Sequence, residues 1–194
     1  MPPGDPAKKR ATIGDLIQAE AEGRRVELLG GELVEKEAAG SRHSGAHLGV
    51  GVALVGFRGP GDDSRPGGWV FKIDPSILAP SGEIPQPDIA GWRRERAPPD
   101  DQFPIEVAPD WVCEVVYSTH YRDVVQKPEI YLAMRVGHYW VIDLKANVLT
   151  VYRWGPDGYI RVAAAGPRDR VRLEPFDAVE LEAWVLFGLE EPPA

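Results

Sequence analysis

The chain has 194 residues and a formal net charge of −8 at pH 7, with the apolar and charged contents of an ordinary globular protein. The acidic balance argues against a protein that coats DNA, although it leaves room for a local basic patch. A single cysteine excludes a disulfide framework within the chain and fits a reducing compartment. Apolar runs are too short to span a bilayer and no signal peptide is recognisable, so we expect a cytoplasmic protein without membrane contact.

One domain is expected for this length, with residues 1–10 as a flexible leader and residues 11–194 as a single domain. Apolar periodicity, glycine and proline predict the elements within it. In chain order they are helices over 13–22 and 119–135; a segment over 46–57 that fits a buried helix, although periodicity alone does not distinguish it from a strand; strands over 25–29, 32–36, 69–73, 88–92, 111–117, 139–144, 148–154 and 159–163; and a closing strand or helix over 179–189. This order predicts an α/β fold with a central mixed sheet, flanking helices and an added β-meander.

Turn residues mark several boundaries between these elements. Gly30-Gly31 predicts a two-residue hairpin turn between the first two strands. Residues 38–45 are an expected loop, and residues 93–108 form a charged, proline-containing segment that we expect at the surface. Pro128 should kink the third helix or mark its first turn.

The strand over 111–117, with the sequence WVCEVVY, is apolar on both faces, as in a central strand covered on both sides. Glu114 interrupts one face, and a carboxylate buried there needs a cation, a metal ion or a raised pKa to offset its desolvation. The alternative is a partly exposed glutamate near the strand end, or one paired with an internal arginine. Cys113 belongs to the opposite face and is expected to be a buried, unreactive thiol.

Asp88 follows a proline at the start of an earlier strand. If that strand and the strand over 111–117 are neighbours, Asp88 and Glu114 project from one end of the sheet and form an oxygen site suited to Mg²⁺ or Mn²⁺. An ion held there would activate water and offset charge on a phosphate, and Lys127 would stabilise that charge or orient the water. Alternatively, Asp123 and Lys127, four residues apart, form an exposed ion pair on the third helix.

Five motifs follow one another along the chain: the hairpin VELLGGELVEK, then PD, then E inside an apolar strand, then D-x-x-x-K-x-x-x-Y, and finally G-x-Y-W-x-x-D. In this order the motifs resemble the Uma-two family of restriction-type endonucleases, which belongs to the PD-(D/E)xK nuclease superfamily. They span about residues 27–143. The resemblance implies a restriction-endonuclease-like fold.

The resemblance also implies roles for individual residues. Asp88 matches the PD aspartate and Glu114 the second carboxylate, which makes both of them catalytic residues and metal ligands. Val116 stands where the superfamily has the ExK lysine, and Lys127 matches a replacement from the following helix. Glu27 matches an N-terminal glutamate that would join the metal site.

The expected function is therefore metal-dependent endonuclease activity on nucleic acid, with DNA favoured as substrate and Mg²⁺ or Mn²⁺ as cofactor. A homodimer would suit the cleavage of two strands, although the sequence identifies no interface. The alternative is a catalytically inactive nuclease-fold module that binds nucleic acid or a protein partner, which the missing ExK lysine and the acidic charge favour. A third hypothesis is a small-molecule-binding protein with a pocket under the segment 93–108.

Three further signals have competing interpretations. His43 matches a family histidine of unassigned role and lies four residues before His47, but no acidic ligand follows and His43 is expected to precede the helix, which disfavours a zinc pair. The arginine-rich stretch 93–96 would grip phosphates near Asp88 or form a solvated loop. Trp92 would stack on a base or, like the other tryptophans, pack in the core.

Overall fold

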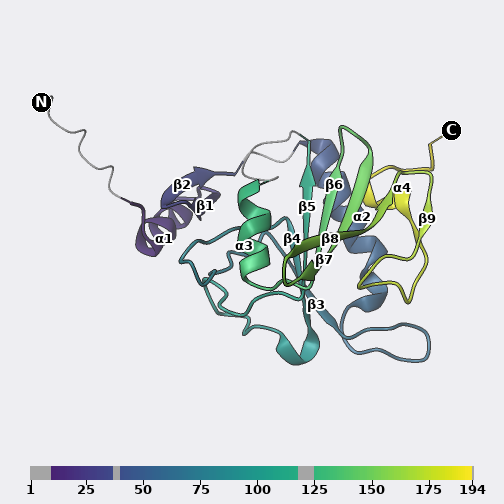
Figure 1. The fold of residues 1–194 in the computed structure, drawn as a ribbon, viewed down its shortest axis with the longest axis horizontal. Coiled ribbons are helices and arrows are strands. Elements are labelled where there is room, and N and C mark those ends of the chain that lie inside the picture. Colours follow the sequence, from purple (N-terminus) through teal and green to yellow (C-terminus); the bar gives the residue numbers. More distant parts are fainter. Residues whose placement is uncertain (1–9, 37–39, 118–124, 194) are drawn as a thin grey trace, which may run out of the picture.

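The computed structural model describes residues 10–36, 40–117 and 125–193. A six-stranded mixed sheet with the strand order β3-β4-β5-β6-β7-β8 forms its centre (Figure 1). β5 and β6 are parallel, and the other neighbouring strands of this sheet are antiparallel. The strands are β3 (Trp69–Ile73), β4 (Ile89–Arg93), β5 (Trp111–Val116), β6 (His138–Asp143), β7 (Val148–Gly155) and β8 (Gly158–Ala165).

β5 is the central strand that the sequence predicts, and all six of its residues are buried. Trp111 and Cys113 belong to the apolar core on one face of the sheet, whereas Val112 belongs to the core on the other face. Strands β6, β7 and β8 follow one another as an antiparallel continuation of the sheet. The predicted α/β fold with a central mixed sheet and an added meander is therefore confirmed.

Helices cover both faces of this sheet (Figure 1). Residues of α2 (Ser41–Ala53) and α4 (Ala183–Leu186) contribute to the core on the Trp111 face. Residues of α3 (Lys127–Ala133) contribute to the core on the opposite face. The residues at the end of β5 therefore receive side chains from helices on two sides.

A small N-terminal unit lies beside the sheet at one end of the molecule (Figure 1). It consists of α1 (Ile13–Ala21) and an antiparallel hairpin of β1 (Val26–Leu29) and β2 (Glu32–Glu35). Both glycines of the predicted turn have positive φ, as a tight two-residue turn requires. Two backbone hydrogen bonds between Leu28 and Ile84 connect the hairpin to the segment that precedes β4.

The prediction of a loop over 38–45 is wrong from residue 41 onwards, because α2 begins at Ser41. The first residues of this helix, SRHSG, include weak helix formers, so their composition hides the helix. Packing of later residues such as Ala46 and Val50 into the core stabilises the helix despite that composition. His43 therefore lies on α2, one turn before His47.

Two predicted ambiguities are resolved. Pro128 lies in the first turn of α3, which was one of its two predicted roles. Residues 118–124, where the predicted third helix begins, lie outside the described residues. The closing segment contains both a strand and a helix, since β10 (Leu181–Glu182) leads directly into α4. β10 pairs with β9 (Arg170–Val171), and short 3-10 helices η1 and η2 occupy Val55–Phe57 and Arg94–Arg96.

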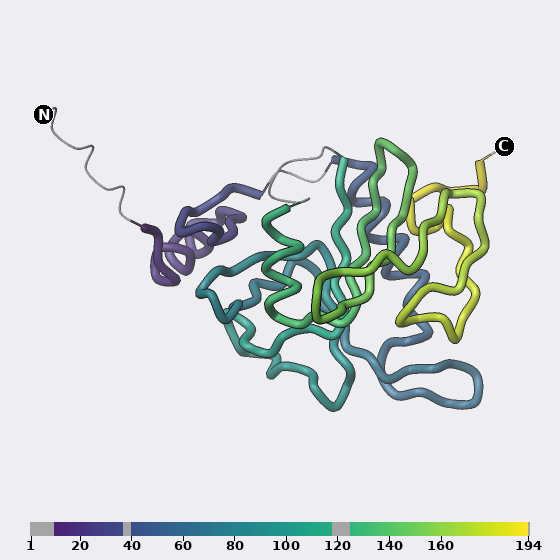
Figure 2. Tube along the Cα trace, in the orientation of Figure 1, coloured from purple at the N-terminus to yellow at the C-terminus, as the bar shows by residue number. Residues whose placement is uncertain are grey.

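The two ends of the described chain lie far apart. Figure 2 shows the first described residues at one end of the longest axis and the C-terminal segment towards the other. No helix in the described part of the chain is long and apolar enough to cross a membrane.

Candidate active site

The predicted carboxylates Asp88 and Glu114 lie on neighbouring strands. β4 and β5 pair with Ile89 opposite Cys113, so Asp88, one residue before β4, continues this register opposite Glu114. The backbone N–H of Val115 donates a 2.7 Å hydrogen bond to Asp88 Oδ2. The two strands are therefore neighbours, which is the condition that the predicted carboxylate site requires.

Glu114 belongs to a buried network around Lys127. Lys127 Nζ lies 3.1 Å from Glu114 Oε1 and 3.0 Å from Glu27 Oε1. The hydroxyl of Tyr131, one turn later on α3, donates a 2.6 Å hydrogen bond to Glu114 Oε1. The Lys127 side chain is only 2% exposed, so it is not part of an exposed surface pair; Asp123, its expected partner in such a pair, lies outside the described residues.

Asp88 belongs to a second group of contacts, formed by side chains from β2 and α2. Lys36 Nζ, just after β2, lies 2.9 Å from Asp88 Oδ1. From α2, His43 Nε2 lies 3.3 Å from Asp88 Oδ2 and His47 Nε2 lies 3.5 Å from Asp88 Oδ1. Three basic side chains therefore surround one buried carboxylate.

The backbone of Gln86 connects the two groups. Its N–H donates a 2.7 Å hydrogen bond to Glu27 Oε1. Its carbonyl accepts hydrogen bonds from Lys36 Nζ at 3.0 Å and from Lys127 Nζ at 3.5 Å. The segment before β4 thus fixes both lysines relative to Asp88.

Carboxylates outnumber lysines among these buried side chains. Glu27, Asp88 and Glu114 are all buried, and they share two largely buried lysines, Lys36 and Lys127. Burial, with help from the charge of Asp88, raises the pKa of Glu114 to about 7 although Lys127 opposes the shift. A region whose carboxylates are only partly neutralised favours the binding of a further cation.

Asp88 stays ionised in this region. Burial alone would raise its pKa, but His43, His47 and Lys36 together hold the pKa well below its ordinary value. The hydrogen bond with Asp88 in turn raises the pKa of His43. For Lys36, burial lowers the pKa, but Asp88 and Glu114 outweigh it and the pKa is raised.

Donor atoms suited to a metal ion converge around Asp88. In the described part of the chain, His43, His47 and Asp88 form a group whose ligand atoms all lie within 4.8 Å of one another. Glu27 and Glu114 are outside this group, since their Oε1 atoms converge on Lys127. The structure thus places all the predicted site residues in one region, while metal binding by Asp88, Glu114 and Glu27 stays a prediction.

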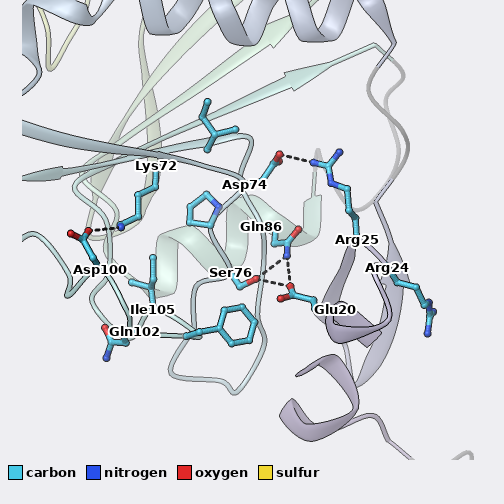
Figure 3. Close-up of a pocket in the computed structure, with 14 residues that line it drawn as sticks. Glu20, Arg24, Arg25, Lys72, Asp74, Ser76, Gln86, Asp100, Gln102 and Ile105 are labelled. Carbon is cyan, nitrogen blue, oxygen red and sulfur yellow. Dashed lines mark hydrogen bonds and ion pairs between the residues drawn. The ribbon is translucent and has the colours of Figure 1, made fainter. Parts of the chain in front are cut away.

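An open pocket of about 670 Å³ lies beside these residues (Figure 3). The side chain of Gln86 lines it and donates hydrogen bonds to Glu20 and Ser76, while its backbone faces the two lysines. Asp74 also lines it, and accepts from Arg25 at 2.6 Å and from Lys36 at 2.5 Å. The pocket and the buried carboxylates therefore share a wall.

Part of the segment 93–108 contributes to this pocket. Asp100, Gln102, Phe103 and Ile105 lie on its wall, opposite the N-terminal unit. A pocket in contact with this segment, as the small-molecule hypothesis requires, is thus present. Its ligand stays a matter of prediction.

The arginine-rich stretch 93–96 does not lie at Asp88. Asp88 precedes β4 and Arg93 ends it, which places them about 16 Å apart along an extended strand. Arg93 instead stacks on the ring of Trp69 at 4.2 Å, and Arg96 pairs with Asp110. The hypothesis that these arginines grip a phosphate next to Asp88 is wrong, because β4 separates them from it.

The remaining two candidates are core residues. Trp92 is fully buried and its indole N–H donates a 2.9 Å hydrogen bond to the carbonyl of Val107, so it is not a surface for base stacking. Cys113 is fully buried, and burial raises the pKa of its thiol well above the ordinary value. The predicted unreactive character of Cys113 fits this environment.

Three residues near the site were not singled out from the sequence: Lys36, Gln86 and Tyr131. Tyr131 could have been found, because it ends the D-x-x-x-K-x-x-x-Y motif and lies one helical turn after Lys127. Lys36 likewise ends the hairpin motif VELLGGELVEK, whereas Gln86 carries no such signal. Their position depends on how the hairpin packs against the segment before β4.

Comparison with known proteins gives a consistent classification. The chain matches the Uma2 (Uma-two) family, described as "putative restriction endonuclease", over residues 13–184. A solved structure described as "a putative nuclease belonging to DUF820", from Anabaena variabilis, superposes with a TM-score of 0.66. The two chains share 17% identity, over 91% of this chain and 97% of that one, so the similarity shows the fold alone. No curated protein matches the sequence.

Proposed function

Because the chain belongs to the Uma2 family, which is described as "putative restriction endonuclease", we propose that it is a metal-dependent endonuclease that hydrolyses phosphodiester bonds in DNA. One observation carries the proposal: three buried carboxylates, those of Glu27, Asp88 and Glu114, share only two lysines, Lys36 and Lys127. Such an excess of buried carboxylates lowers the stability of a structural core, whereas in a metal site a bound divalent cation would neutralise it.

In this proposal Asp88 and Glu114 hold Mg²⁺ or Mn²⁺, and Glu27 assists them. The bound ion would lower the pKa of a water molecule and offset charge on the phosphate. Tyr131 fixes the orientation of Glu114 through its 2.6 Å hydrogen bond. Lys127, held between Glu27 and Glu114, would stabilise charge on the phosphate or orient the attacking water.

A cleavage assay tests this assignment. Supercoiled, linear and single-stranded DNA, and RNA, are incubated with Mg²⁺ or Mn²⁺ and wild-type protein, Asp88→Ala, Glu114→Ala or Lys127→Ala. We expect cleavage of DNA by wild type and a loss of about 10²-fold or more in each variant, because each removes charge stabilisation at the phosphate.

Exposed residues of the same types supply the controls. Glu190→Ala and Lys145→Ala alter side chains at the surface and should cleave like wild type. Cleavage that persists in Asp88→Ala and Glu114→Ala would mean that the activity comes from another site or another protein. Cleavage of RNA but not of DNA would support the assigned catalytic residues and contradict DNA as the substrate.

One observation favours the alternative of a catalytically inactive module. Asp88, Glu114 and Lys127 are each only 2–3% exposed, and their charges lie against one another. If this network serves stability, wild type should bind nucleic acid or a protein partner without cleaving it, and Lys127→Ala should unfold at a lower temperature with no change in binding.

The homodimer is a further part of the proposal. Two copies related by a two-fold axis would present two sites to the two strands of a duplex. Light scattering after size exclusion, with and without a DNA duplex, measures the mass directly. A monomeric mass in both conditions would contradict it.

A further inference from the structure

Two histidines and one carboxylate share a small volume beside α2. His43 and His47 are one helical turn apart, and their ring centroids are 4.4 Å apart with planes tilted by 50°. Asp88 lies next to both, at 3.3 Å from His43 Nε2 and 3.5 Å from His47 Nε2. The acidic ligand that the sequence pattern lacks after His47 is therefore supplied by a different element of the fold.

These contacts have the dimensions of a metal site rather than of strong hydrogen bonds. Good N–H···O bonds measure about 2.9 Å, whereas neighbouring ligands of a tetrahedral ion at about 2.1 Å lie about 3.4 Å apart. Moreover, His47 Nε2 and His43 Nδ1 are buried and find no hydrogen-bond partner among the described residues. Buried polar atoms without a partner are destabilising, and coordination of an ion would satisfy His47 Nε2.

We propose that His43, His47 and Asp88 bind a first-row transition-metal ion, of the class of Mn²⁺, Co²⁺ and Zn²⁺, in preference to Mg²⁺. Two imidazole nitrogens and one carboxylate oxygen suit these ions, whereas Mg²⁺ prefers oxygen ligands in an octahedron. Three protein ligands leave a coordination position open, as in catalytic sites. The binding stands on this geometry alone, and a part for the ion in cleavage rests on the proposed function.

Lys36 competes with such an ion for Asp88. Its Nζ lies 2.9 Å from Asp88 Oδ1, the oxygen that also faces His47. A divalent ion next to this ammonium group would be repelled by it. Removal of the Lys36 charge should therefore tighten metal binding. A misfolded variant would bind the metal more weakly, so misfolding cannot explain such a result.

The test measures metal binding without activity, on full-length protein from which any polyhistidine tag has been removed. Co²⁺ is titrated and followed by its visible absorption, and Mn²⁺, Zn²⁺ and Mg²⁺ are compared by calorimetry. We expect Co²⁺ to bind at least 100-fold more tightly than Mg²⁺. His43→Gln and His47→Gln should each weaken Co²⁺ binding at least 10-fold, and Lys36→Met should tighten it at least 3-fold.

His138→Gln is the matched control, since His138 is a half-buried histidine that also contacts a carboxylate, Glu174, at 3.2 Å. Its Co²⁺ affinity should equal that of wild type. Equal Co²⁺ binding by wild type, His43→Gln and His47→Gln would overturn the site, as would an unchanged affinity in Lys36→Met.

The same samples separate this inference from the proposed function. Co²⁺ binding that depends on both histidines, without cleavage of any nucleic acid, would support the metal site and remove the endonuclease. Cleavage that needs Asp88 and Glu114, together with Co²⁺ binding that is unchanged in His43→Gln and His47→Gln, would support the endonuclease and remove the metal site.

Discussion

At the scale of single residues, Glu114 is a carboxylate that the proposed function needs but whose ionised form lowers the stability of the fold. Burial raises its pKa from the ordinary value of 4.5 to about 7. Since the folded state holds the proton more tightly than the unfolded state, this residue stabilises the fold below about pH 4.5, and the stabilisation is lost as the pH rises through about 7. At neutral pH and above, the protein keeps a buried charge that a packing role would not require.

Glu114→Gln should remove this pH dependence, because the amide does not ionise. Between pH 5 and pH 8 we expect its stability relative to wild type, measured as the difference in free energy of unfolding, to increase by a few kcal/mol. Urea denaturation at several pH values measures the difference. Glu190→Gln, at an exposed glutamate, should show no trend, and a constant difference for Glu114→Gln would refute the assigned shift.

At the scale of elements, the packing of α2 against α4 positions the two histidines. A Cβ at Gly49 would lie 1.8 Å from the carbonyl oxygen of Val185, which means that α2 and α4 touch through their backbones. A Cβ at Gly51, on the same helix, would meet no atom within 4 Å. At Gly49 the close neighbour of α2 is thus α4.

Two substitutions of the same chemistry should therefore have opposite effects. Gly49→Ala should destabilise the protein by about 2–3 kcal/mol, because α4 must move away. Gly51→Ala should stabilise it by about 0.5–1 kcal/mol, because alanine favours a helix that has room for it. Thermal or chemical denaturation of both variants is the measurement, and equal effects at the two positions would show that α2 and α4 are not in close contact.

At the scale of the whole molecule, the net charge of −8 means that the proposed endonuclease would have to hold DNA through local groups of cations. Arg24, Arg25 and Lys72 line the pocket beside the buried carboxylates (Figure 3). The arginines of the stretch 93–96 lie at the other end of β4. DNA that reaches Asp88 should therefore pass over the pocket rather than over η2.

Arg25→Ala should weaken DNA binding equally for all sequences and lower the slope of log affinity against log salt by about 1, because one phosphate contact is lost. Arg94→Ala, which removes an exposed arginine from the other end, should bind like wild type. Fluorescence anisotropy in EDTA, which prevents metal-dependent cleavage, measures both. A larger loss for Arg94→Ala would place the DNA on the opposite side.

The sequence by itself determined the strands of the central sheet and of the N-terminal hairpin, and the three residues at the centre of the site. The run from Trp111 to Val116 is apolar on both faces, which is a property of one element and can be recognised along it. Glu114 stands out within that run because a carboxylate is costly there. Asp88 and Lys127 follow from the order of motifs, and all three meet in the structure.

Only the tertiary structure decided which basic groups meet Asp88. His43 and His47 come from a helix on one face of the sheet, and Lys36 comes from the hairpin beside it. Periodicity reports which face of an element is buried, but it carries no information on which other element covers that face. The pairing of Asp88 with these residues depends on how separate elements pack, and so do the excess of carboxylates over lysines and the metal geometry that follow from it.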